Sequence, residues 1–243
     1  MKERIVAWIK KQVRLARVKG IVMGLSGGID SSVIAALAKQ AVGAKRLLAL
    51  VLPCHSQKED RADALLVARQ LGIKTKVVDL SGLYDMFLKS LPRGNKLALA
   101  NLKSRLRMVV FYYYANTLNY LVCGTGNKSE LMIGYFTKHG DGATDILPLG
   151  DLLKKDVRVL ARALDIPERV ITKPPTAGLW PGQTDEDEMG VTYSELDEIL
   201  ERLEKKQVPV VAKKKVDKIK KMIARSEHKR QGPKICYRRN GGI

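Results

Sequence analysis

The chain has 243 residues, of which 45% are hydrophobic, and this length and composition place it among globular proteins with a packed core. It contains no run of about 18 apolar residues, which excludes a membrane-spanning helix, and its start is typical of an amphipathic helix rather than a signal peptide. Cys54, Cys123 and Cys236 stand alone without a C-x-x-C pair, which excludes a disulfide framework and a cysteine zinc site. We therefore expect a cytoplasmic protein.

Charge is the most unusual feature of the composition. The chain has 44 lysine or arginine residues and 25 aspartate or glutamate residues, which gives a formal net charge of +19. Residues 205–239 hold 14 of the basic residues and two acidic ones, so much of the excess lies near the C-terminus. Such a field attracts nucleic acid, and it equally favours a small substrate rich in phosphate.

Apolar runs alternate with helical periodicity along the chain, which predicts a parallel sheet covered by helices. The best strands are Ile21 to Leu25, Leu47 to Leu52, Lys76 to Leu80 and Tyr120 to Cys123. Helices are expected over about residues 2–18, 31–42, 58–71, 97–117, 127–134, 154–164, 192–204 and 213–226. The pattern indicates a single α/β domain over residues 1–243, with a doubly wound, mostly parallel sheet and helices on both faces.

Loops that follow parallel strands meet at the carboxyl edge of the sheet, where ligands bind in folds of this class. The loop at Ser26, the stretch Pro53 to Gln57 and the stretch Gly124 to Asn127 all follow predicted strands, so we expect them to converge. The least regular stretches are Gly140 to Gly150 and Lys173 to Met189, and their length is typical of functional loops.

A glycine-rich loop follows the first strand and opens the next helix. It reads Gly24-Leu25-Ser26-Gly27-Gly28-Ile29-Asp30-Ser31. Its glycines let backbone N–H groups approach an anion, and the helix N-terminus adds unpaired donors. It lacks the lysine of a Walker loop, and the carboxylate of Asp30 beside a phosphate implies a cation such as Mg²⁺ between them. A plain turn with Asp30 as a helix cap is the alternative.

A second glycine-rich stretch nearly matches the dinucleotide fingerprint G-x-G-x-x-G. It reads Gly124-Thr125-Gly126-Asn127-Lys128-Ser129. Its last position is serine, and the acid expected about 20 residues further on has no following strand to carry it. The sequence therefore disfavours a hydride-transferring dinucleotide enzyme.

The first loop resembles the pyrophosphate-binding loop of the ATP-pyrophosphatase (PP-loop) superfamily, whose members cleave ATP to AMP and pyrophosphate. Later segments narrow the resemblance. They are Asn101-Leu102-Lys103-Ser104-Arg105-Leu106-Arg107-Met108, Gly124 to Glu130, Gly134-Tyr135-Phe136-Thr137-Lys138-His139-Gly140-Asp141-Gly142, Lys173-Pro174-Pro175-Thr176-Ala177-Gly178-Leu179-Trp180, Gln183-Thr184-Asp185-Glu186 and Glu227-His228-Lys229-Arg230. In this order and spacing they resemble ammonia-dependent NAD synthetase over essentially the whole chain.

The resemblance implies an adenine nucleotide alpha-hydrolase-like fold and a ligase that forms a C–N bond. The family amidates deamido-NAD (nicotinic acid adenine dinucleotide) with ammonia, giving NAD, AMP and pyrophosphate through a deamido-NAD adenylate. ATP is then a co-substrate, Mg²⁺ a cofactor, and the loop holds the departing pyrophosphate. The resemblance also implies a homodimer, for which the helix from Leu97 to Leu118 is the expected contact, and a basic segment of about residues 205–243 closing over the site.

Carried over residue by residue, the resemblance implies three sets of contacts. The ATP-binding set is Gly24, Leu25, Ser26, Gly27, Gly28, Ile29, Asp30, Ser31, Thr125, Lys154 and Thr176. The Mg²⁺ ligands are Asp30 and Glu130, and the deamido-NAD set is Arg105, Lys138, Asp145, His228 and Lys229. The expected catalytic residues are Lys154, which neutralises phosphate charge, and Asp141, a hypothetical base, since ammonium must lose a proton before it attacks.

Two other functions remain open. A transfer-RNA-modifying PP-loop pyrophosphatase fits the loop and the net charge of +19, although thiolating enzymes of that kind need a reactive cysteine pair that this sequence does not show. A nucleotide-binding protein without catalysis is the other. We expect small-molecule substrates, no nucleic-acid or membrane partner, and free ammonia as the nitrogen donor, because 243 residues leave no room for a glutaminase domain.

Overall fold

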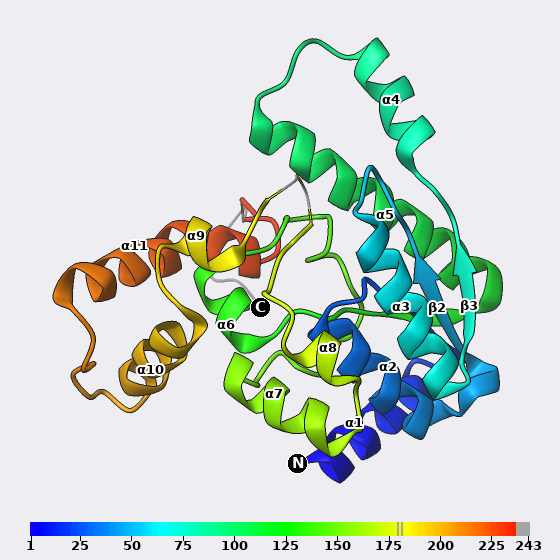
Figure 1. The fold of residues 1–243 in the computed structure, drawn as a ribbon, viewed down its shortest axis with the longest axis horizontal. Coiled ribbons are helices and arrows are strands. Elements are labelled where there is room, and N and C mark those ends of the chain that lie inside the picture. The colour runs from blue at the N-terminus through cyan, green and yellow to red at the C-terminus, as the bar shows by residue number, and fades with distance from the viewer. Residues whose placement is uncertain (179, 181, 237–243) are drawn as a thin grey trace.

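A parallel sheet lies at the centre of the molecule (Figure 1). The computed structural model describes residues 1–178, 180 and 182–236, and within them the strands are β1 (Gly20–Gly24), β2 (Leu47–Val51), β3 (Lys74–Val77) and β4 (Tyr120–Cys123). They lie in the order β3-β2-β1-β4, and each pair of neighbours is parallel. The predicted α/β fold is confirmed.

The two central strands are uninterrupted apolar runs because both of their faces are covered. Ile21 of β1 pairs with Leu47 of β2 on one side and with Leu121 of β4 on the other. The edge strand β3 reads Lys-Thr-Lys-Val and is largely exposed, and lysines at an edge discourage pairing with another chain. The sequence predicts this strand at residues 76–80, where its apolar residues lie, but pairing begins at Lys74, directly after the turn that ends the preceding helix.

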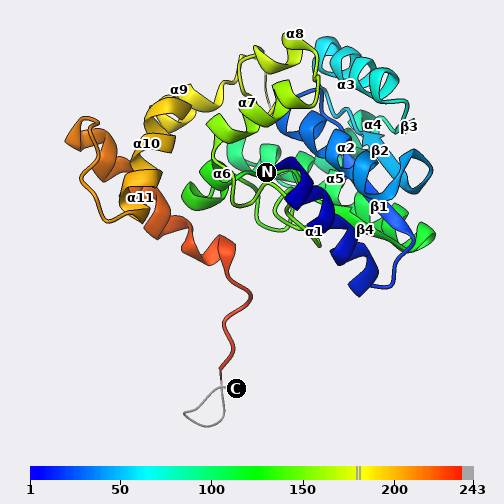
Figure 2. The same ribbon diagram turned by 90° about the horizontal axis from the view of Figure 1, so that it is seen from below.

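Helices cover both faces of the sheet, which makes it doubly wound (Figures 1 and 2). One face carries α1 (Lys2–Leu15), α2 (Ile29–Val42), α3 (Lys58–Leu71), α7 (Lys154–Ala163) and α8 (Glu168–Ile171), and the other carries α4 (Ser81–Ser90) and α5 (Lys96–Leu118). Side chains alternate between the faces along a strand, so Ile21 and Met23 join the first core whereas Val22 joins the second.

A third core builds a helical unit beside the sheet. It contains α6 (Lys128–Ile133), α9 (Asp185–Met189), α10 (Tyr193–Glu204) and α11 (Lys213–Arg230). Met189, Tyr193, Ile199 and Ile219 are completely buried in it. Figures 1 and 2 both show α10 and α11 at one end of the molecule, remote from α4. Since α6 follows β4, it connects this unit to the sheet.

The helices α4, α8 and α9 lie where the sequence predicts none. The last two have four and five residues, which is too short for helical periodicity to be visible. A glycine at its second position weakens the helical signal of α4, and Asp79 starts this helix by accepting a hydrogen bond from the Ser81 N–H over 2.9 Å. None of the described helices is long and apolar enough to cross a membrane.

The helix α11 packs closely against Gly134, the residue that ends α6. Gly134 has a φ of +71°, and a Cβ built there would lie 2.1 Å from Ser226 Cβ. We expect Gly134→Ala to lower the free energy of unfolding by about 2–4 kcal/mol, because it adds a clash to a left-handed backbone. Gly72→Ala is the matched control, since Gly72 ends α3 with a φ of +59° and such a Cβ has nothing within 4 Å.

The control is expected to lower the free energy of unfolding by about 1 kcal/mol, because it changes the strain of the left-handed backbone alone. Urea denaturation measures both variants. Equal losses would show that the contact between α6 and α11 is not tight.

Candidate active site

The glycine-rich loop joins β1 to α2 at the carboxyl edge of the sheet, as predicted. Gly27 has a φ of +83°, and a Cβ there would lie 2.3 Å from the carbonyl oxygen of Asp60, so only glycine fits. Ser31 Oγ donates to the carbonyl oxygen of Gly28 over 3.0 Å and lies 3.0 Å from Ser26 Oγ. Gly28 is the N-cap of α2 and has no side chain to satisfy the first N–H groups of the helix. The loop therefore presents backbone donors and the positive end of α2 to an anion.

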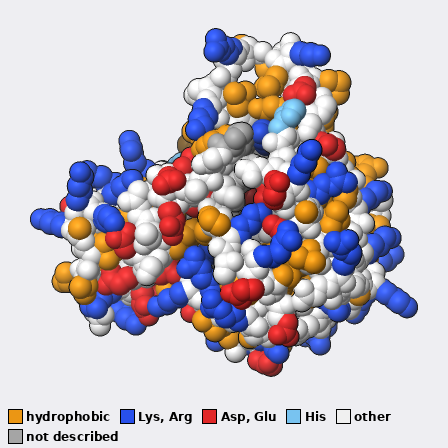
Figure 3. Space-filling model, viewed as in Figure 1, with side chains coloured by type: hydrophobic (Ala, Val, Ile, Leu, Met, Phe, Trp, Pro, Cys, Tyr) orange, Lys and Arg blue, Asp and Glu red, His pale blue; other side chains and the backbone are white. Residues whose placement is uncertain are grey.

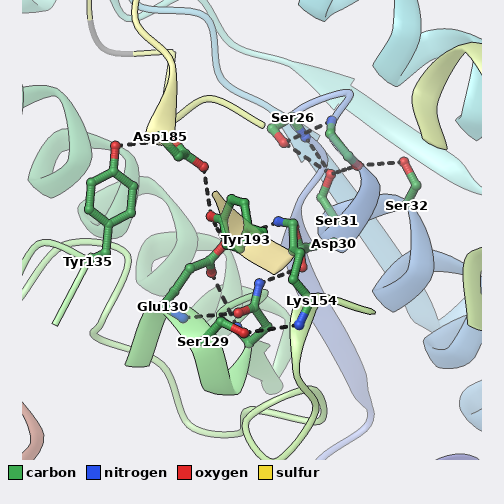
Figure 4. Close-up of polar contacts among 12 residues, drawn as sticks. Ser26, Asp30, Ser31, Ser32, Ser129, Glu130, Tyr135, Lys154, Asp185 and Tyr193 are labelled. Atoms are coloured by element: carbon green, nitrogen blue, oxygen red, sulfur yellow. Dashed lines mark hydrogen bonds and ion pairs between the residues drawn. The ribbon is translucent and has the colours of Figure 1, made fainter. Parts of the chain in front are cut away.

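A buried lysine bridges two carboxylates beside this loop (Figure 4). Lys154 Nζ lies 2.6 Å from Asp30 Oδ2 and 3.3 Å from Glu130 Oε1, and the lysine side chain is 2% exposed. Asp30 Oδ1 also accepts a hydrogen bond from Asn127 Nδ2 over 2.9 Å. The fold thus brings together the two expected metal ligands and the expected catalytic lysine, each from a different helix.

Three residues for which the sequence predicts no individual role complete this cluster. Tyr193 O–H donates to Asp185 Oδ2 over 2.9 Å and lies 3.3 Å from Glu130 Oε1, and Lys154 Nζ lies 4.7 Å from the centre of the Tyr193 ring. Tyr135 O–H donates to Asp185 Oδ1 over 3.1 Å. Asp185 stands in a segment that carries the family resemblance, which is a signal in the sequence. Tyr193 opens an ordinary amphipathic helix and has no such signal.

Burial determines how these groups are charged. It raises the pKa of Glu130 to about 7, and the ammonium group of Lys154 works against that rise. Burial lowers the pKa of Lys154, but Asp30 and Glu130 outweigh it, so this pKa lies above its ordinary value. Burial also raises the pKa of Asp185. Lys154 is therefore charged, and three carboxyl groups surround one ammonium group.

This excess of carboxyl groups fits a divalent cation. Asp30 and Glu130 each place an oxygen within 3.3 Å of the same nitrogen, so one ion is able to contact both. The described part of the chain contains no group of three or more His, Cys, Asp or Glu side chains arranged to hold a metal. Mg²⁺ bound to nucleotide phosphates needs only one or two protein carboxylates and takes its other ligands from phosphate and water. The donor set therefore fits Mg²⁺ that arrives with a nucleotide.

Four of the five expected deamido-NAD residues lie in one basic cluster. Lys138 Nζ donates to the carbonyl oxygen of His228 over 2.5 Å, and Arg105 Nη2 donates to the carbonyl oxygen of Lys138 over 3.4 Å. Lys229 Nζ donates to two carbonyl oxygens of the segment that follows α6, over 2.7 and 2.8 Å. The end of α11 is thereby fastened to this segment.

Asp145, the fifth expected deamido-NAD residue, holds a loop in place, and so does the expected base Asp141. Asp145 Oδ2 accepts from the Val122 N–H over 2.7 Å, and its Oδ1 accepts from Tyr112 O–H over 3.0 Å. Asp141 Oδ1 accepts from the Thr137 N–H over 2.9 Å and from a serine hydroxyl of α5 over 2.7 Å. These bonds occupy both oxygens of Asp145 and one oxygen of Asp141.

A cavity of about 60 Å³ lies next to the lysine cluster. Thr125, Glu130, Phe136 and Asp141 are among the residues that line it, so it joins an expected ATP contact, an expected metal ligand and the expected base. Thr176, the remaining expected ATP contact, lies on the loop after α8, where its hydroxyl accepts a hydrogen bond from a backbone N–H over 3.1 Å.

An ion cluster fastens the loop after α8 to α3. Lys173 Nζ lies 2.7 Å from Asp60 Oδ1 and 2.8 Å from Asp63 Oδ2, and Arg169 also pairs with Asp63. The backbone of Asp60 is the one that abuts the glycine-rich loop. The cluster therefore connects the loop after α8 to the glycine-rich loop through α3.

A parallel sheet whose first strand leads into a glycine-rich loop with free backbone donors, beside a buried cluster of carboxylates and a lysine, is the arrangement of an enzyme of the α/β class. The family model for NAD synthase matches residues 1–233. The chain belongs to the NAD synthase family, and it is a ligase that forms a C–N bond.

Two relatives and two solved structures match along nearly their whole length. The NH3-dependent NAD+ synthetases of Archaeoglobus fulgidus and Carboxydothermus hydrogenoformans are each 47% identical, with 96% of this chain and 95% of each relative covered. The structure of NMN synthetase from Francisella tularensis is 40% identical with a TM-score of 0.88, covering 99% of this chain and 97% of that one. NH3-dependent NAD synthetase from Campylobacter jejuni is 30% identical with a TM-score of 0.85, covering 97% of both chains.

The ion cluster on α3 makes stability depend on pH. Burial acts to raise the pKa of Asp63, but hydrogen bonds from Lys173 and Arg169 outweigh it and lower this pKa below its ordinary value. The carboxylate therefore stabilises the fold above the unfolded aspartate pKa of about 3.9, and this contribution disappears as pH falls through the lower folded pKa. We expect Asp63→Asn to lower the free energy of unfolding by about 1–3 kcal/mol at neutral pH. In acid, its free energy of unfolding should approach that of the wild type.

Urea denaturation across this pH range is the measurement. Glu59→Gln is the control, because Glu59 lies exposed on the same helix, and it should change stability by less than about 0.5 kcal/mol. A loss in Asp63→Asn that is independent of pH would contradict the ionic role of Asp63.

Proposed function

We propose that the chain converts deamido-NAD to NAD with ammonia, at the expense of ATP, which becomes AMP and pyrophosphate. The observation that carries this proposal is the Lys154 cluster beside the phosphate-binding loop, with two carboxylates on one buried ammonium. The names of the A. fulgidus and C. jejuni relatives support both the product and the nitrogen donor.

The chemistry requires an activated acid, because a carboxylate is a poor electrophile. A carboxylate oxygen of deamido-NAD attacks the α-phosphorus of ATP, and pyrophosphate leaves. Ammonia then attacks the acyl carbon of the adenylate, AMP leaves with the electron pair of the acyl–oxygen bond, and the nitrogen loses a proton. Charge builds on the leaving pyrophosphate, and fixed donors aimed at that charge lower the barrier.

The roles of the chain's residues follow from their positions. The backbone N–H groups at the N-terminus of α2 bind the pyrophosphate, and Lys154 neutralises charge at the phosphates. Asp30 and Glu130 hold Mg²⁺, which supplies positive charge to the phosphate oxygens when bound. Thr125 and Thr176 contact ATP.

The cavity beside Glu130 suits the amidation step. Its volume of about 60 Å³ exceeds the roughly 30 Å³ that a water molecule occupies in the liquid, and ammonia is of similar size. Asp141 lines this cavity, and its Oδ2 has no hydrogen-bond partner in the described residues, so it is placed to take a proton from ammonium. Phe136 offers an aromatic face for the pyridine ring.

The basic cluster formed by Arg105, Lys138, His228 and Lys229 binds the remainder of deamido-NAD, and Asp145 is a further contact to this substrate. In support, the end of α11 lies on the segment after α6, which links this cluster to the cavity. We propose that the whole chain acts as one domain, with residues 205–243 closing over the substrate. Residues 237–243 of that segment lie outside the described part.

Free ammonia is the proposed nitrogen donor. The chain covers 95% of the A. fulgidus NH3-dependent relative but 46% of the glutamine-dependent NAD+ synthetase chain from Acinetobacter baumannii, which is 28% identical. A cytoplasmic location, where ATP is available, completes the proposal.

One comparison favours a second substrate. The F. tularensis structure, which is named an NMN synthetase, matches with 40% identity. Nicotinic acid mononucleotide carries the same carboxylate as deamido-NAD but lacks the adenylyl half. The reaction steps above apply to it unchanged.

The transfer-RNA-modifying alternative is not favoured. The matched relatives are NAD synthetases. Burial raises the pKa of both Cys54 and Cys123, which keeps these thiols protonated and unreactive.

The decisive assay follows pyrophosphate and NAD from ATP, Mg²⁺ and deamido-NAD, with ammonium and separately with glutamine. We expect equal amounts of both products with ammonium and none with glutamine. Asp30→Ala should lower kcat by about 10–100-fold or more, because it removes a metal ligand and the closest partner of Lys154. Asp151→Asn is the control, since that side chain is 96% exposed and pairs with Lys128 at the surface.

Mononucleotide in place of deamido-NAD forms a parallel arm. A higher kcat/KM for the mononucleotide than for deamido-NAD would show that the mononucleotide is the preferred substrate, and the proposed mechanism would apply to it unchanged. Pyrophosphate release that ignores both nicotinate compounds would overturn the substrate class.

We also propose a homodimer that forms through α4 and α5. These helices carry several exposed apolar side chains, and hydrophobic atoms are visible on this arm at the top of Figure 3. The exposed apolar side chains of α4 and α5 are Leu83, Met86, Phe87, Leu97, Val109 and Tyr113. An exposed apolar patch of this kind marks an interaction surface. Most of the aromatic run on α5 is not part of it, since Phe111, Tyr112 and Tyr114 pack into the second core.

Val109→Asp is expected to convert dimers to monomers, because it places a charge in the proposed interface. Val159→Asp on α7 is the matched control, as both valines are 59% exposed. Analytical ultracentrifugation measures the two masses. A dimer that survives Val109→Asp and dissociates in Val159→Asp would move the interface to α7.

A further inference from the structure

The helix that carries Lys154 begins without a cap of its own. Its N-cap residue is Leu153, whose side chain has no atom that accepts a hydrogen bond, yet the first N–H groups of a helix need partners. Water is largely kept away, since Leu153 is 8% exposed and Lys154 is 2% exposed. Asp156 of the helix itself accepts a hydrogen bond from the Leu153 N–H, but the N–H groups of Lys154 and Lys155 depend on groups from elsewhere in the fold.

A carboxylate of α10 supplies the missing partners. Asp197 Oδ2 accepts a hydrogen bond from the Lys155 N–H over 2.8 Å, and its Oδ1 accepts from Ser129 Oγ over 2.5 Å. Ser129 Oγ in turn accepts from the Lys154 N–H over 3.0 Å. Asp197 is 2% exposed and Ser129 is fully buried, so all three bonds are shielded from solvent.

These three bonds fix the backbone next to both partners of the buried ion pair between Lys154 and Glu130. Ser129 directly precedes Glu130 on α6, and Lys154 is the first residue of α7. Because Asp197 binds Ser129 and the first turn of α7 together, it sets the backbone positions from which Lys154 and Glu130 reach each other. The negative charge of Asp197 also faces the positive end of α7, which stabilises the start of that helix.

We propose that Asp197 is a positioning residue of the active site, which caps α7 from another helix and holds Lys154 and Glu130 in their reactive arrangement. Its side chain points to the backbone of the site rather than to the substrate. The effect on turnover rests on the proposed function, whereas the effect on the backbone does not.

Asp197→Asn is the sharpest variant, because it keeps the shape and removes the charge. Its single carbonyl oxygen is able to replace one of the two accepting oxygens, while its amino group faces a donor. We expect kcat to fall by about 10–100-fold, which is typical for residues that orient metal ligands without contacting the metal themselves. KM for deamido-NAD should change by less than about threefold, because the end of α11 is held by other bonds.

Two control variants on α10 separate positioning from general stability. Glu201→Gln breaks the surface bridge to Lys155 Nζ, one helical turn beyond Asp197. Ile199→Val trims the third core without touching the site. Both should retain kcat, and Ile199→Val should lower the melting temperature. A kcat for Asp197→Asn equal to that of wild type, measured well below its melting temperature, would overturn the proposal.

Ser129→Ala adds a test of the connection between these residues. If Asp197 acts through Ser129, the double variant should lose far less than the product of the two single losses. Independent, multiplying losses would show that Asp197 acts by another route.

Hydrogen exchange tests the cap without any turnover. We expect the amides at the start of α7 to exchange faster in Asp197→Asn, and to be unchanged in Glu201→Gln. If the wild-type enzyme makes no NAD, the proposed function fails and the exchange result alone decides the role of Asp197. Unchanged exchange in Asp197→Asn would overturn that role.

Discussion

The site depends on the ion pairs of one ammonium group. Lys154 carries this group, and carboxylates from separate helices enclose it. A lysine that is 2% exposed stays charged only where acids surround it, and here Asp30 and Glu130 do so. Removing one partner of such a buried pair typically costs about 3–5 kcal/mol, because the other charge is left without compensation. Since the three residues belong to α2, α6 and α7, they meet only when all three helices have packed. Formation of the site is therefore coupled to folding of the cores.

Sheet topology explains why these helices meet. β1 and β4 are parallel neighbours, so the helices that follow them, α2 and α6, both begin at the same edge of the sheet. Asp30 and Glu130 each lie in the first turn of their helix, and Lys154 is the first residue of α7. Three positive helix ends thus converge on one point. They offset part of the carboxylate charge, and the end of α2, which has no side-chain cap, suits the phosphates of a nucleotide.

Local motifs made part of this arrangement predictable. The glycine-rich loop and Asp30 form a short segment whose residue types have a chemical reason, whereas Glu130 was indicated by the family resemblance alone. Strand-to-loop order placed them at one edge. Tyr193 and Asp197 could not be found this way, because both lie in α10 outside any such motif, and their partners Glu130 and Lys155 belong to other helices. Whether Tyr193 faces a carboxylate or solvent is decided by how α10 packs, and its sequence has the same amphipathic pattern in either case. The β3 strand was misplaced for a related reason, since polar residues at a sheet edge resemble a loop.

The basic C-terminal segment makes structural contacts that its composition does not reveal. Lys205 and Lys215 pair with the acids of α10, and Arg230 donates to the carbonyl oxygens at the end of α6. Lys229 donates to the carbonyl oxygens of the segment that follows α6. Side chains fixed in this way have already lost conformational freedom before a ligand binds, so less entropy is lost on binding. A diffuse field of mobile lysines would attract many polyanions, whereas cations anchored beside one cavity favour a ligand that spans from that cavity to α11.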